Sequence, residues 1–473
     1  MKKKFILLLF ILLTSFITAQ QNVETLQAKL DNLLSGNFFE STLAAVDVYD
    51  LTQQKILYQK NNKMLLHPAS NMKILSSAAG LIFLGGDYLF QTKLFYTGKI
   101  INETLYGDLF VSGGCDPDFT GDDLDSLVFA ISALGIKEIL GNLFGDVSMT
   151  DSLFWGKGWM WDDDPSIDAP YLSALSINKN SLVVSANGTN PELPVTLTIQ
   201  PETNYVDIEN DGTTVALSDT NTLTIDRDWL NRKNTIIVKG SLKQYDRKVV
   251  KLNMYKPELY FLTLFKEKLN KAGIRLTGSI RIFDSPSDAE FLYSFNRLYD
   301  SILVSLNKES DNLSAEMVLR GLSEKYSGKP ATAENGIKLI DSLIILTGLK
   351  PSQYRIVDGS GVSHYNLVSA ELILAVLKYM YSQHPELYGR LYNSFPIAGI
   401  DGTLKNRMKN TPAEGNVHAK TGTLSGVSCL SGYLTSKNGS IIAFSVLIQN
   451  HVKNTSAVLR FQDQICNILV NYK

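Results

Sequence analysis

The sequence predicts an α/β (α+β) fold in which one antiparallel sheet joins both ends of the chain and packs against a cluster of helices. Strand-like segments near the two termini flank a long helical region, whereas the middle of the chain alternates apolar and polar residues between frequent turn signals. The 473 residues also exceed what one hydrophobic core usually organises. We therefore predict a first domain at 20–90 and 285–473, an inserted domain at 91–180 and 251–284, and a small β domain nested in the insertion at 181–250.

The composition is that of a globular protein whose function depends on local sites. Hydrophobic residues make up 44% of the chain and charged residues 19%, and the formal net charge is −2. A charge so close to zero gives no reason to expect nucleic acid as a partner. The 5 histidines are scattered without the short spacing of metal ligands, so neither a metal nor another cofactor is predicted.

The N-terminus has the pattern of a secretory signal peptide at residues 1–19. Three lysines precede an apolar run at 5–17, and the small Ala19 stands before two glutamines. An uncleaved membrane anchor is the alternative. Because no later segment approaches the ~20 apolar residues of a membrane span, we expect an exported protein, periplasmic or otherwise extracytoplasmic.

The cysteines do not form a disulfide framework. Cys115, Cys429 and Cys466 are an odd number, so at most one internal pair could form. We therefore expect the hydrophobic core to hold the fold, and the oxidation state of the three thiols stays open.

The first 90 residues predict one short helix, a hairpin and one long helix. The helix at 24–34 precedes the two strands of the hairpin, at 44–49 and 55–58. The long helix at 68–84 has almost no polar face, which is typical of a buried central helix. The two glycines at 85–86 are expected to end it.

After residue 90, the sequence predicts strands in the insertion, then a helical region, then a closing hairpin. In the insertion, alternation and periodicity indicate strands at 195–199, 223–225, 235–238 and 278–283 and a helix at 258–272. Helices are predicted to dominate 298–384. Strands at 427–434 and 441–449 are expected to meet through a two-residue turn at Asn438 and Gly439. A last helix is expected to begin with Asn454 as its N-cap.

The helix at 68–84 opens with the first of three chemical motifs. Ser70 and Lys73 stand three residues apart, so both project from one helix face, and a neutral lysine amine could accept the serine proton. The alternative is an N-cap serine beside a solvated lysine. Burying an ammonium in a helix with almost no polar face is costly unless it has a partner or a role, and this favours the chemical interpretation.

The second motif is Ser310, Asp311 and Asn312, in a segment between two predicted helices. Ser, Asp and Asn are all favoured N-cap residues, so a plain helix start is the alternative. The triplet gains meaning only beside the other motifs.

The third motif is Lys420, Thr421, Gly422 and Thr423, on an extended segment before the closing hairpin. On a strand Lys420 and Gly422 share one face, and the bare glycine lets a ligand backbone approach closely. Lysine supplies a cation for a substrate carboxylate, and threonine supplies a hydroxyl donor. An ordinary edge strand is the alternative.

In this order the three motifs are the signature set of β-lactamases and penicillin-binding proteins. Ser70 and Ser310 stand 310 − 70 = 240 positions apart, and a long insertion between them marks the penicillin-binding protein 4 group (class C, peptidase family S13). The whole mature chain resembles this group. Further similarity lies in five short stretches, at 113–117, 158–163, 171–178, 358–361 and 401–404. Two departures are small: Thr423 stands where serine is also common, and Cys115 is an unusual choice before Asp116.

The resemblance implies a β-lactamase/transpeptidase-like catalytic domain and a serine D-alanyl-D-alanine carboxypeptidase or endopeptidase. Peptidoglycan stem peptides would be the substrates, and β-lactam antibiotics would be covalent inhibitors. Ser70 would attack the carbonyl of the penultimate D-alanine, and Lys73 is the candidate base. Peripheral contact with a membrane, or with a second copy of the chain, stays open.

The resemblance also assigns roles to the other two motifs. Ser310 would relay a proton to the leaving nitrogen, and Asn312 would hydrogen-bond the substrate amide and the base. Lys420 and Thr421 would hold the terminal carboxylate of the substrate. The backbone N–H groups of the nucleophile and of Thr423 would form the oxyanion hole.

Three other features are given structural interpretations. The aromatic cluster of Trp155, Trp159, Trp161 and Tyr171 is interpreted as packing rather than as a sugar or peptide platform. The acidic run at 162–164 is interpreted as a solvated loop, although contact with cationic stem peptides is equally compatible with it. The segment at 358–361 is expected to form a tight turn beside the site, without a chemical role.

Two other functions stay open at this point. A β-lactamase or an esterase could use the same scaffold, but the 240-position gap and the lack of a Glu-x-x-x-Asn pattern after Ser310 disfavour a class A β-lactamase. A catalytically silent wall-binding protein is disfavoured because all the motif side chains are present. Carboxypeptidases and endopeptidases share the motifs, so their balance, the stem-peptide preference and the identity of the base stay open.

Overall fold

The computed structural model describes residues 25–452 and 455–473. The signal peptide predicted at 1–19 and the N-cap predicted at Asn454 lie outside these residues. None of the described helices is both long and apolar enough to cross a membrane.

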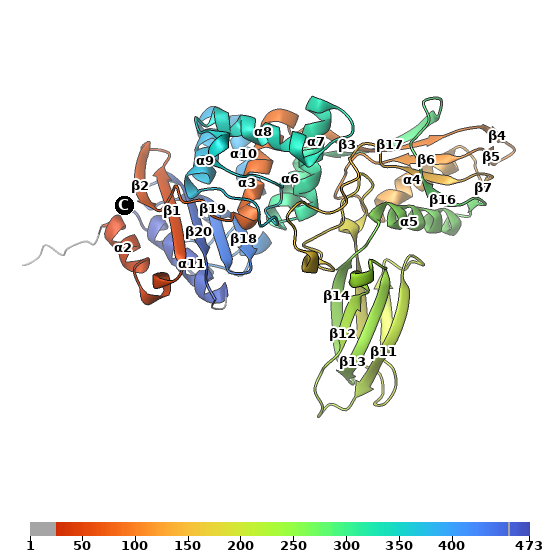
Figure 1. Ribbon diagram of the computed structural model, residues 1–473, viewed down its shortest axis with the longest axis horizontal. Coiled ribbons are helices and arrows are strands. Elements are labelled where there is room, and N and C mark those ends of the chain that lie inside the picture. The colour runs from red at the N-terminus through yellow and green to blue at the C-terminus, as the bar shows by residue number, and fades with distance from the viewer. Residues whose placement is uncertain (1–24, 453–454) are drawn as a thin grey trace, which may run out of the picture.

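One five-stranded antiparallel sheet brings the two ends of the chain together (Figure 1). Its strands follow the spatial order β18 (His418–Leu424), β19 (Val427–Thr435), β20 (Ile441–Gln449), β1 (Leu43–Asp50) and β2 (Lys55–Lys60). The first and last hairpins meet through β1 and β20, where Val46 lies opposite Val446. The predicted α/β fold class, with a sheet shared by both ends of the chain, is confirmed.

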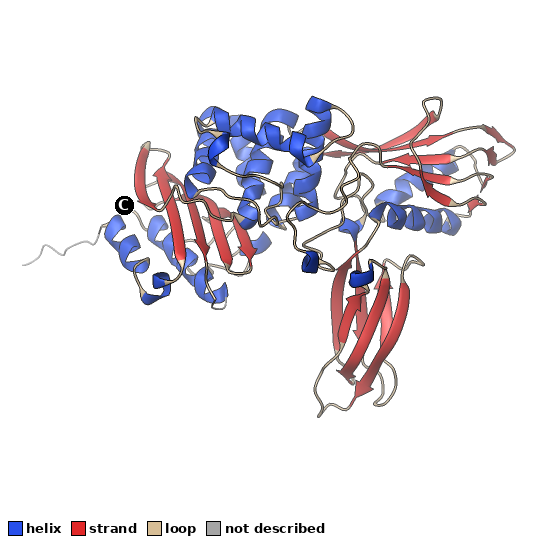
Figure 2. Cartoon of the chain, in the orientation of Figure 1, coloured by secondary structure: helices blue, strands red, loops and turns tan. Residues whose placement is uncertain are grey.

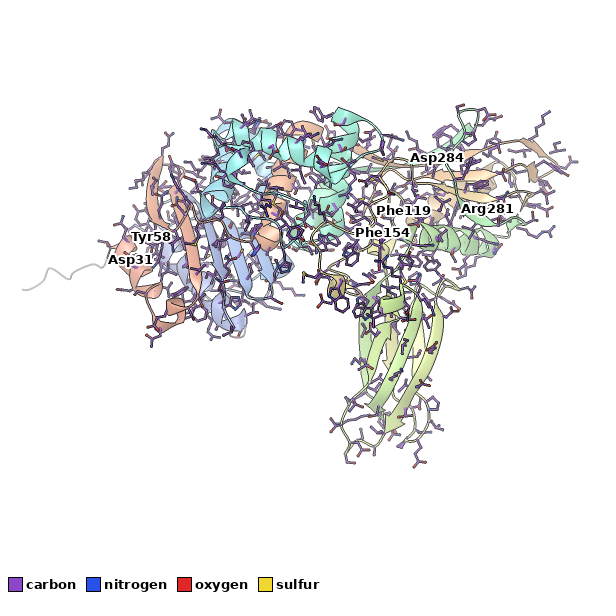
Figure 3. The ribbon with its side chains drawn as sticks, viewed as in Figure 1. Asp31, Tyr58, Phe119, Phe154, Arg281 and Asp284 are labelled. Carbon is purple, nitrogen blue, oxygen red and sulfur yellow. The ribbon has the colours of Figure 1, made fainter. Side chains whose placement is uncertain are left out.

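Helices cover both faces of this sheet (Figure 2). Side chains alternate along β1, so that Ala45 packs in the helix cluster while Val46 faces the opposite side. The helix cluster consists of α3 (Met72–Ala79), α6 (Tyr299–Lys308), α7 (Asn312–Ser327), α8 (Ala333–Leu346), α9 (Ala370–Gln383) and α10 (Pro385–Ser394). The opposite face carries α2 (Leu26–Leu33) and α11 (Thr455–Val470). Tyr58 of β2 donates a 2.7 Å hydrogen bond to Asp31 of α2 (Figure 3).

The central helix predicted at 68–84 is divided into three parts. A 3₁₀ turn at Ala69–Asn71 leads into α3, and a π-helical turn follows at Gly80–Leu84. The predicted single helix is therefore wrong in its regularity, although its burial is as expected. The tight approach of Tyr299 explains the glycine in the π-helical turn, because a Cβ on Gly80 would lie 2.3 Å from the tyrosine Oη.

The closing hairpin has a longer loop than the predicted two-residue turn. Thr435 pairs with Ile441, so five residues, 436–440, connect β19 and β20. The Asn438 side chain accepts hydrogen bonds from Ser436 Oγ at 2.6 Å and from Ser440 N at 3.0 Å, which stabilises the wider loop. Gly439 supplies a positive φ of 85° within it.

The insertion contains two mixed sheets and two helices. One sheet has the order β16-β8-β6-β3-β17 and the other the order β15-β7-β5-β4. Their elements are β3 (Leu89–Tyr96), β4 (Lys99–Ile101), β5 (Thr104–Tyr106), β6 (Leu109–Ser112), α4 (Asp123–Ala133), β7 (Glu138–Ile139), β8 (Leu143–Asp146), α5 (Pro257–Lys271), β15 (Arg275–Leu276), β16 (Ile280–Ile282) and β17 (Glu290–Leu298). Because β17 pairs with β3, this hydrogen bonding continues past the predicted boundary at 285. The domain boundaries stay a prediction.

The nested β unit projects away from the rest of the chain (Figure 1). It consists of two three-stranded sheets with the orders β10-β9-β14 and β11-β13-β12. The strands are β9 (Ser181–Asn187), β10 (Thr196–Gln200), β11 (Asp207–Val215), β12 (Thr224–Arg227), β13 (Thr235–Lys243) and β14 (Arg247–Asn253). Val184 and Val238 belong to one buried cluster with α5 of the insertion, so the two parts share a continuous core.

Candidate active site

The three motifs predicted from sequence meet in one pocket of about 420 Å³ beside the edge strand β18. The residues of the three motifs that line it are Ser70, Ser310, Asn312, Thr421, Gly422 and Thr423. Lys73 and Lys420 lie behind this lining and are fully buried. The structure therefore brings all eight predicted residues together, with the two lysines withdrawn from solvent.

Lys73 occupies the centre of a hydrogen-bond network. Its Nζ donates to Ser70 Oγ at 2.9 Å and to the backbone oxygen of Ser360 at 2.7 Å, and it also donates to Asn312 Oδ1. Burial lowers the pKa of Lys73 to about 8, although nearby carboxylates, Asp358 first among them, oppose this shift. A lysine with this pKa can lose its proton near neutral pH and accept the hydroxyl proton across the same contact.

Lys420 holds the serine of the second motif. Its Nζ donates to Ser310 Oγ at 2.8 Å and to the backbone oxygen of Thr421 at 2.8 Å. Burial, together with the charge of Lys73, places the pKa of Lys420 well below its usual value. The cation predicted to hold a substrate carboxylate thus stands behind the pocket wall, and the Thr421 hydroxyl lies in front of it beside Thr403, with 2.7 Å between the two oxygens.

Close backbone packing positions Ser70. A Cβ on Gly422 would lie 3.0 Å from Ser70 N, and a Cβ on Gly361 would lie 1.8 Å from the backbone oxygen of Ala69. Ala69 itself adopts a φ of 45°, which alanine rarely does. Glycine is required at position 361, where φ is also positive, whereas a side chain at position 422 would crowd the turn that carries Ser70.

The second motif both starts a helix and contributes side chains to the pocket. Asp311 is the N-cap of α7 and accepts a 2.6 Å hydrogen bond from Ser314 N, so the triplet does start a helix. Ser310 has a φ of 61°, an unusual conformation for serine that brings its side chain to the pocket. The two ends of the Asn312 amide have different partners. Its Oδ1 accepts a hydrogen bond from Lys73, and its Nδ2 donates to the backbone oxygen of Asp168 at 2.5 Å.

The loop at 358–361 has a larger role than the turn predicted for it. Asp358 is buried and accepts hydrogen bonds from Ser360 Oγ, Gly361 N, Ser363 N and the side chains of Trp159 and Asn366. These bonds fix the loop whose Ser360 carbonyl binds the lysine of the first motif. Asp358 is therefore a positioning residue that sequence reasoning missed, although the stretch at 358–361 was singled out.

A second buried carboxylate supports the same loop. Glu316 Oε1 accepts from Gly359 N at 2.9 Å and from Ser360 N at 3.0 Å, while Oε2 accepts from Arg320 at 2.7 Å. Burial raises the pKa of Glu316 despite the arginine. The available signal was an acidic residue four positions before an arginine in an apolar helix.

The opposite wall of the pocket comes from the insertion. We call residues 151–172 the strap, and its members Asp163, Ser166, Asp168 and Ala169 line the pocket. The strap is anchored by Trp159, whose Nε1 donates to Asp358 at 2.9 Å.

Two interpretations of the strap need correction. The acidic run is only partly solvated, because Asp164 is buried, forms an ion pair with Arg227 and accepts a 2.7 Å hydrogen bond from Tyr171. The interpretation of the aromatic cluster as packing holds for Trp159 and Tyr171, which are buried. It does not hold for Trp161, which is 68% exposed. The aromatic cluster is therefore not only core.

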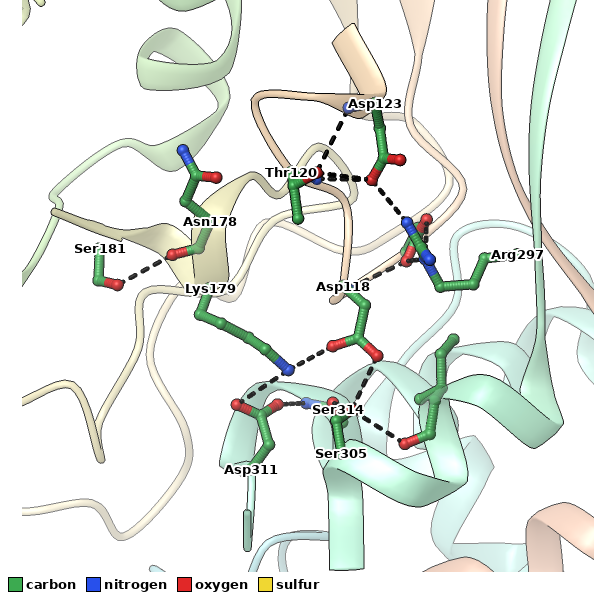
Figure 4. A network of polar contacts seen from close by, with 12 residues as sticks. Asp118, Thr120, Asp123, Asn178, Lys179, Ser181, Arg297, Ser305, Asp311 and Ser314 are labelled. Atoms are coloured by element: carbon green, nitrogen blue, oxygen red, sulfur yellow. Dashed lines mark hydrogen bonds and ion pairs between the residues drawn. The ribbon is translucent and has the colours of Figure 1, made fainter. Parts of the chain in front are cut away.

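A polar network joins the insertion to the second motif (Figure 4). Lys179 forms ion pairs with Asp118 and with Asp311, the residue between Ser310 and Asn312. Asp118 also accepts a 2.7 Å hydrogen bond from Ser305 of α6. These charges stabilise the start of α7, and no local sequence pattern predicts that residues so far apart would meet.

The three cysteine thiols are buried and lie outside the pocket lining. Cys115, Cys429 and Cys466 are free and buried, and burial raises the pKa of each. Within residues 25–452 and 455–473, no three His, Cys, Asp or Glu side chains are grouped so that they could hold a metal ion. The pocket lining contains hydroxyls, an amide and carboxylates, and the Lys73 amine contacts the Ser70 hydroxyl from behind it.

Comparisons with known proteins agree with this geometry. The sequence pattern of the D-Ala-D-Ala carboxypeptidase 3 (S13) family matches residues 26–472. The chain is 31% identical over 464 residues to a D-alanyl-D-alanine carboxypeptidase of Actinomadura sp. (strain R39), covering 94% of this chain and 85% of that protein. It is 29% identical over 451 residues to the D-alanyl-D-alanine carboxypeptidase DacB of Haemophilus influenzae, covering 89% of this chain and 91% of that one.

The fold is also similar to solved structures of a penicillin-binding protein. The crystal structure of penicillin-binding protein 4 from Haemophilus influenzae superposes with a TM-score of 0.82 at 28% identity, covering 94% of this chain and 99% of that one. A second crystal structure of that protein, complexed with a β-lactam, superposes with a TM-score of 0.76 at 26% identity, over 94% and 99% of the two chains. The chain described here belongs to the D-Ala-D-Ala carboxypeptidase 3 (S13) family.

Proposed function

We propose that this protein is a serine D-alanyl-D-alanine carboxypeptidase, with endopeptidase activity at the same site, that hydrolyses peptidoglycan stem peptides or their cross-links. The observation that carries the proposal is the contact between Ser70 Oγ and the buried amine of Lys73, whose pKa is lowered to about 8. Membership of the S13 family and the named carboxypeptidase relatives support it. The predicted signal peptide supports a location outside the cytoplasm.

In the first step Lys73 removes the hydroxyl proton and Ser70 attacks the carbonyl of the penultimate D-alanine. The bond between this carbonyl carbon and the nitrogen of the last D-alanine breaks, which leaves an acyl ester on the serine. Ser310, hydrogen-bonded to Lys420, relays a proton from the lysine pair to the leaving nitrogen and takes up a replacement as it gives up its own, so that the proton removed from Ser70 is balanced by the one on the released D-alanine. Water then hydrolyses the ester by the same groups acting in reverse. The backbone N–H groups of Ser70 and Thr423 are proposed to hold the oxyanion.

The terminal carboxylate of the substrate is proposed to meet hydroxyls rather than the lysine itself. Thr421 and Thr403 both line the pocket, whereas Lys420 is fully buried behind them. Lys420 then acts on the substrate indirectly, because its Nζ holds Ser310 Oγ and the backbone oxygen of Thr421. Asp163, Asp168 and Glu309 also line the pocket and suit a stem peptide that carries a free amine.

Labelling with a fluorescent penicillin tests the nucleophile. The protein without residues 1–19 is incubated beside Ser70→Ala, and the intact mass of each is measured. One adduct per chain on the parent and none on the variant is the expected result. Absence of any adduct on folded protein, across several β-lactams, would contradict the proposal and favour a silent wall-binding protein.

The lifetime of the adduct separates the enzyme from a β-lactamase. A penicillin-binding enzyme should keep its acyl group for many minutes, since it is not built to bring water onto a penicilloyl ester. Rapid turnover of penicillin would instead favour the β-lactamase alternative. Release of D-alanine from a pentapeptide, followed by chromatography of digested peptidoglycan, then measures the carboxypeptidase and endopeptidase activities separately.

A further inference from the structure

A second hollow, of about 290 Å³, borders the strap. Its strap side includes Trp155 and Trp161, and its other side comes from the nested β unit, through Trp229, Leu230 and Arg232. Phe154, at the same junction, lies just above the nested unit in Figure 3. We call this feature the aromatic hollow. None of the eight motif residues lines it, so it is separate from the catalytic pocket.

The walls of the aromatic hollow expose unusually large apolar side chains. Trp161 is 68% exposed and Leu230 is 70% exposed. The rings of Trp161 and Trp229 lie 5.3 Å apart with an angle of 32° between their planes. The two rings therefore pack side by side, and large aromatic side chains exposed together at a concave surface are typical of binding sites.

Polar groups surround these rings without filling the aromatic hollow. At its base the buried Asp164 is held by Tyr171 and Arg227. At its rim the exposed Arg232 lies over the Phe154 ring, 5.4 Å from the centroid. Flat apolar surfaces with hydrogen-bonding groups at the edge suit a pyranose sugar, which has C–H groups on its faces and hydroxyl or amide groups around its edge.

The size and position of the aromatic hollow narrow the choice of ligand. About 290 Å³ lies at the lower end of small-molecule sites, roughly 300–1,000 Å³, so one or two sugar rings fit better than a folded partner. The strap lines both sites. Its Trp161 and Asp164 line the aromatic hollow, and its Asp163 and Asp168 line the catalytic pocket. A ligand that reaches both sites needs sugar and peptide in one molecule.

We propose that the aromatic hollow binds an N-acetylhexosamine ring of the glycan strand to which the stem peptide is attached. This inference rests on the proposed function, because it assumes that the peptide in the catalytic pocket belongs to peptidoglycan. The nested β unit then acts in substrate recognition: it supplies Trp229 as one face of the sugar site. The strap places that site beside the pocket in which the peptide is cut.

Binding of tri-N-acetylchitotriose, measured by calorimetry, tests the aromatic hollow. The chain carries Ser70→Ala so that no catalysis contributes, and Trp229→Ala is compared with Trp229→Phe in that background. Loss of a buried aromatic contact should weaken binding about tenfold in the alanine variant, and phenylalanine should restore most of it. Tyr245→Ala is the matched control, because Tyr245 is a 79% exposed aromatic residue of the same nested unit outside the hollow.

The outcomes separate this inference from the proposed function. No binding of chitotriose, or equal binding by the parent chain and Trp229→Ala, would overturn the sugar site even if penicillin labels Ser70. Weaker binding by Trp229→Ala alone would support the site even if penicillin does not label the serine. An equal loss with Tyr245→Ala would also overturn it, because the effect would then reflect the nested unit as a whole.

Discussion

The two walls of the catalytic pocket are built on different principles. On the wall formed by the sheet and the helix cluster, Lys73 and Lys420 are fully buried, and they donate hydrogen bonds to Ser70 and Ser310, respectively. On the wall formed by the strap, Asp163 is half-buried and Asp168 is exposed. Groups that move protons gain from desolvation and fixed geometry, whereas groups that select a charged substrate must still reach it from water.

Hydrogen bonds connect the two walls of the pocket. Trp159 donates to Asp358, and Asn312 donates to the backbone oxygen of Asp168. The first contact reaches the loop that binds Lys73, so three successive hydrogen bonds link the strap to this lysine. Substitutions on the two walls should therefore have effects of different size and kind.

Lys73→Ala tests the buried wall and should have the largest effect. Without the amine, no group accepts the proton of Ser70, so the rate of acylation by penicillin should fall by roughly 10²–10⁴-fold. Stopped-flow fluorescence measures this rate. The thermal midpoint is the control, because Asn312 Oδ1 and the Ser360 carbonyl lose their common donor. An unchanged acylation rate would exclude Lys73 as the base.

The pH dependence of acylation should follow Lys73. Its pKa is lowered to about 8, so the neutral amine is the minor form at pH 6 and becomes the major form above pH 8. The acylation rate should rise about tenfold per unit between pH 6 and 7 and level off above 8. A rate that is flat from pH 6 to 8, measured on protein of constant circular dichroism, would show that no group with this pKa controls the step.

Trp159→Phe tests the contact between the walls and should have an intermediate effect. The variant keeps a ring in the core but leaves Asp358 without one of its five donors. We expect the free energy of unfolding to fall by about 1–3 kcal/mol, and acylation to slow several-fold through the loop that holds the base. Trp155→Phe is the matched control, since no hydrogen bond to this carboxylate is removed. Equal effects of the two variants would mean that ring volume, not the hydrogen bond, matters.

Asp168→Asn tests the solvated wall and should have the smallest effect. The change removes one negative charge from the pocket and leaves in place the backbone oxygen that accepts from Asn312. For a stem peptide with a free amine, KM should rise about threefold while kcat and penicillin acylation stay the same. Asp162→Asn, on the strap but outside the pocket lining, serves as the control. A change in kcat instead of KM would place Asp168 among the groups that act on the reaction itself.

Local patterns were sufficient to predict most of the secondary structure and the motif residues that meet in one pocket. The alternating and helical periods placed the terminal strands and the helix cluster, because a side chain's neighbours along one element are set by its spacing in the sequence. Ser70 and Lys73 were readable for the same reason, as both lie within one turn of one segment. The spacing of apolar residues could not predict the change from 3₁₀ to α to π geometry at 69–84. This change depends on close contacts such as that of Tyr299 with Gly80.

What the sequence by itself determined is the set of motifs, their order and the class of fold that carries them. Only the tertiary structure decided which residues support the site from a distance: Asp358 and Glu316 behind Lys73, Lys179 beside the second motif, and the strap along the opposite wall. Periodicity reports which face of an element is apolar but not which distant element will cover it. A buried charge becomes stable only where such a distant partner completes its hydrogen bonds.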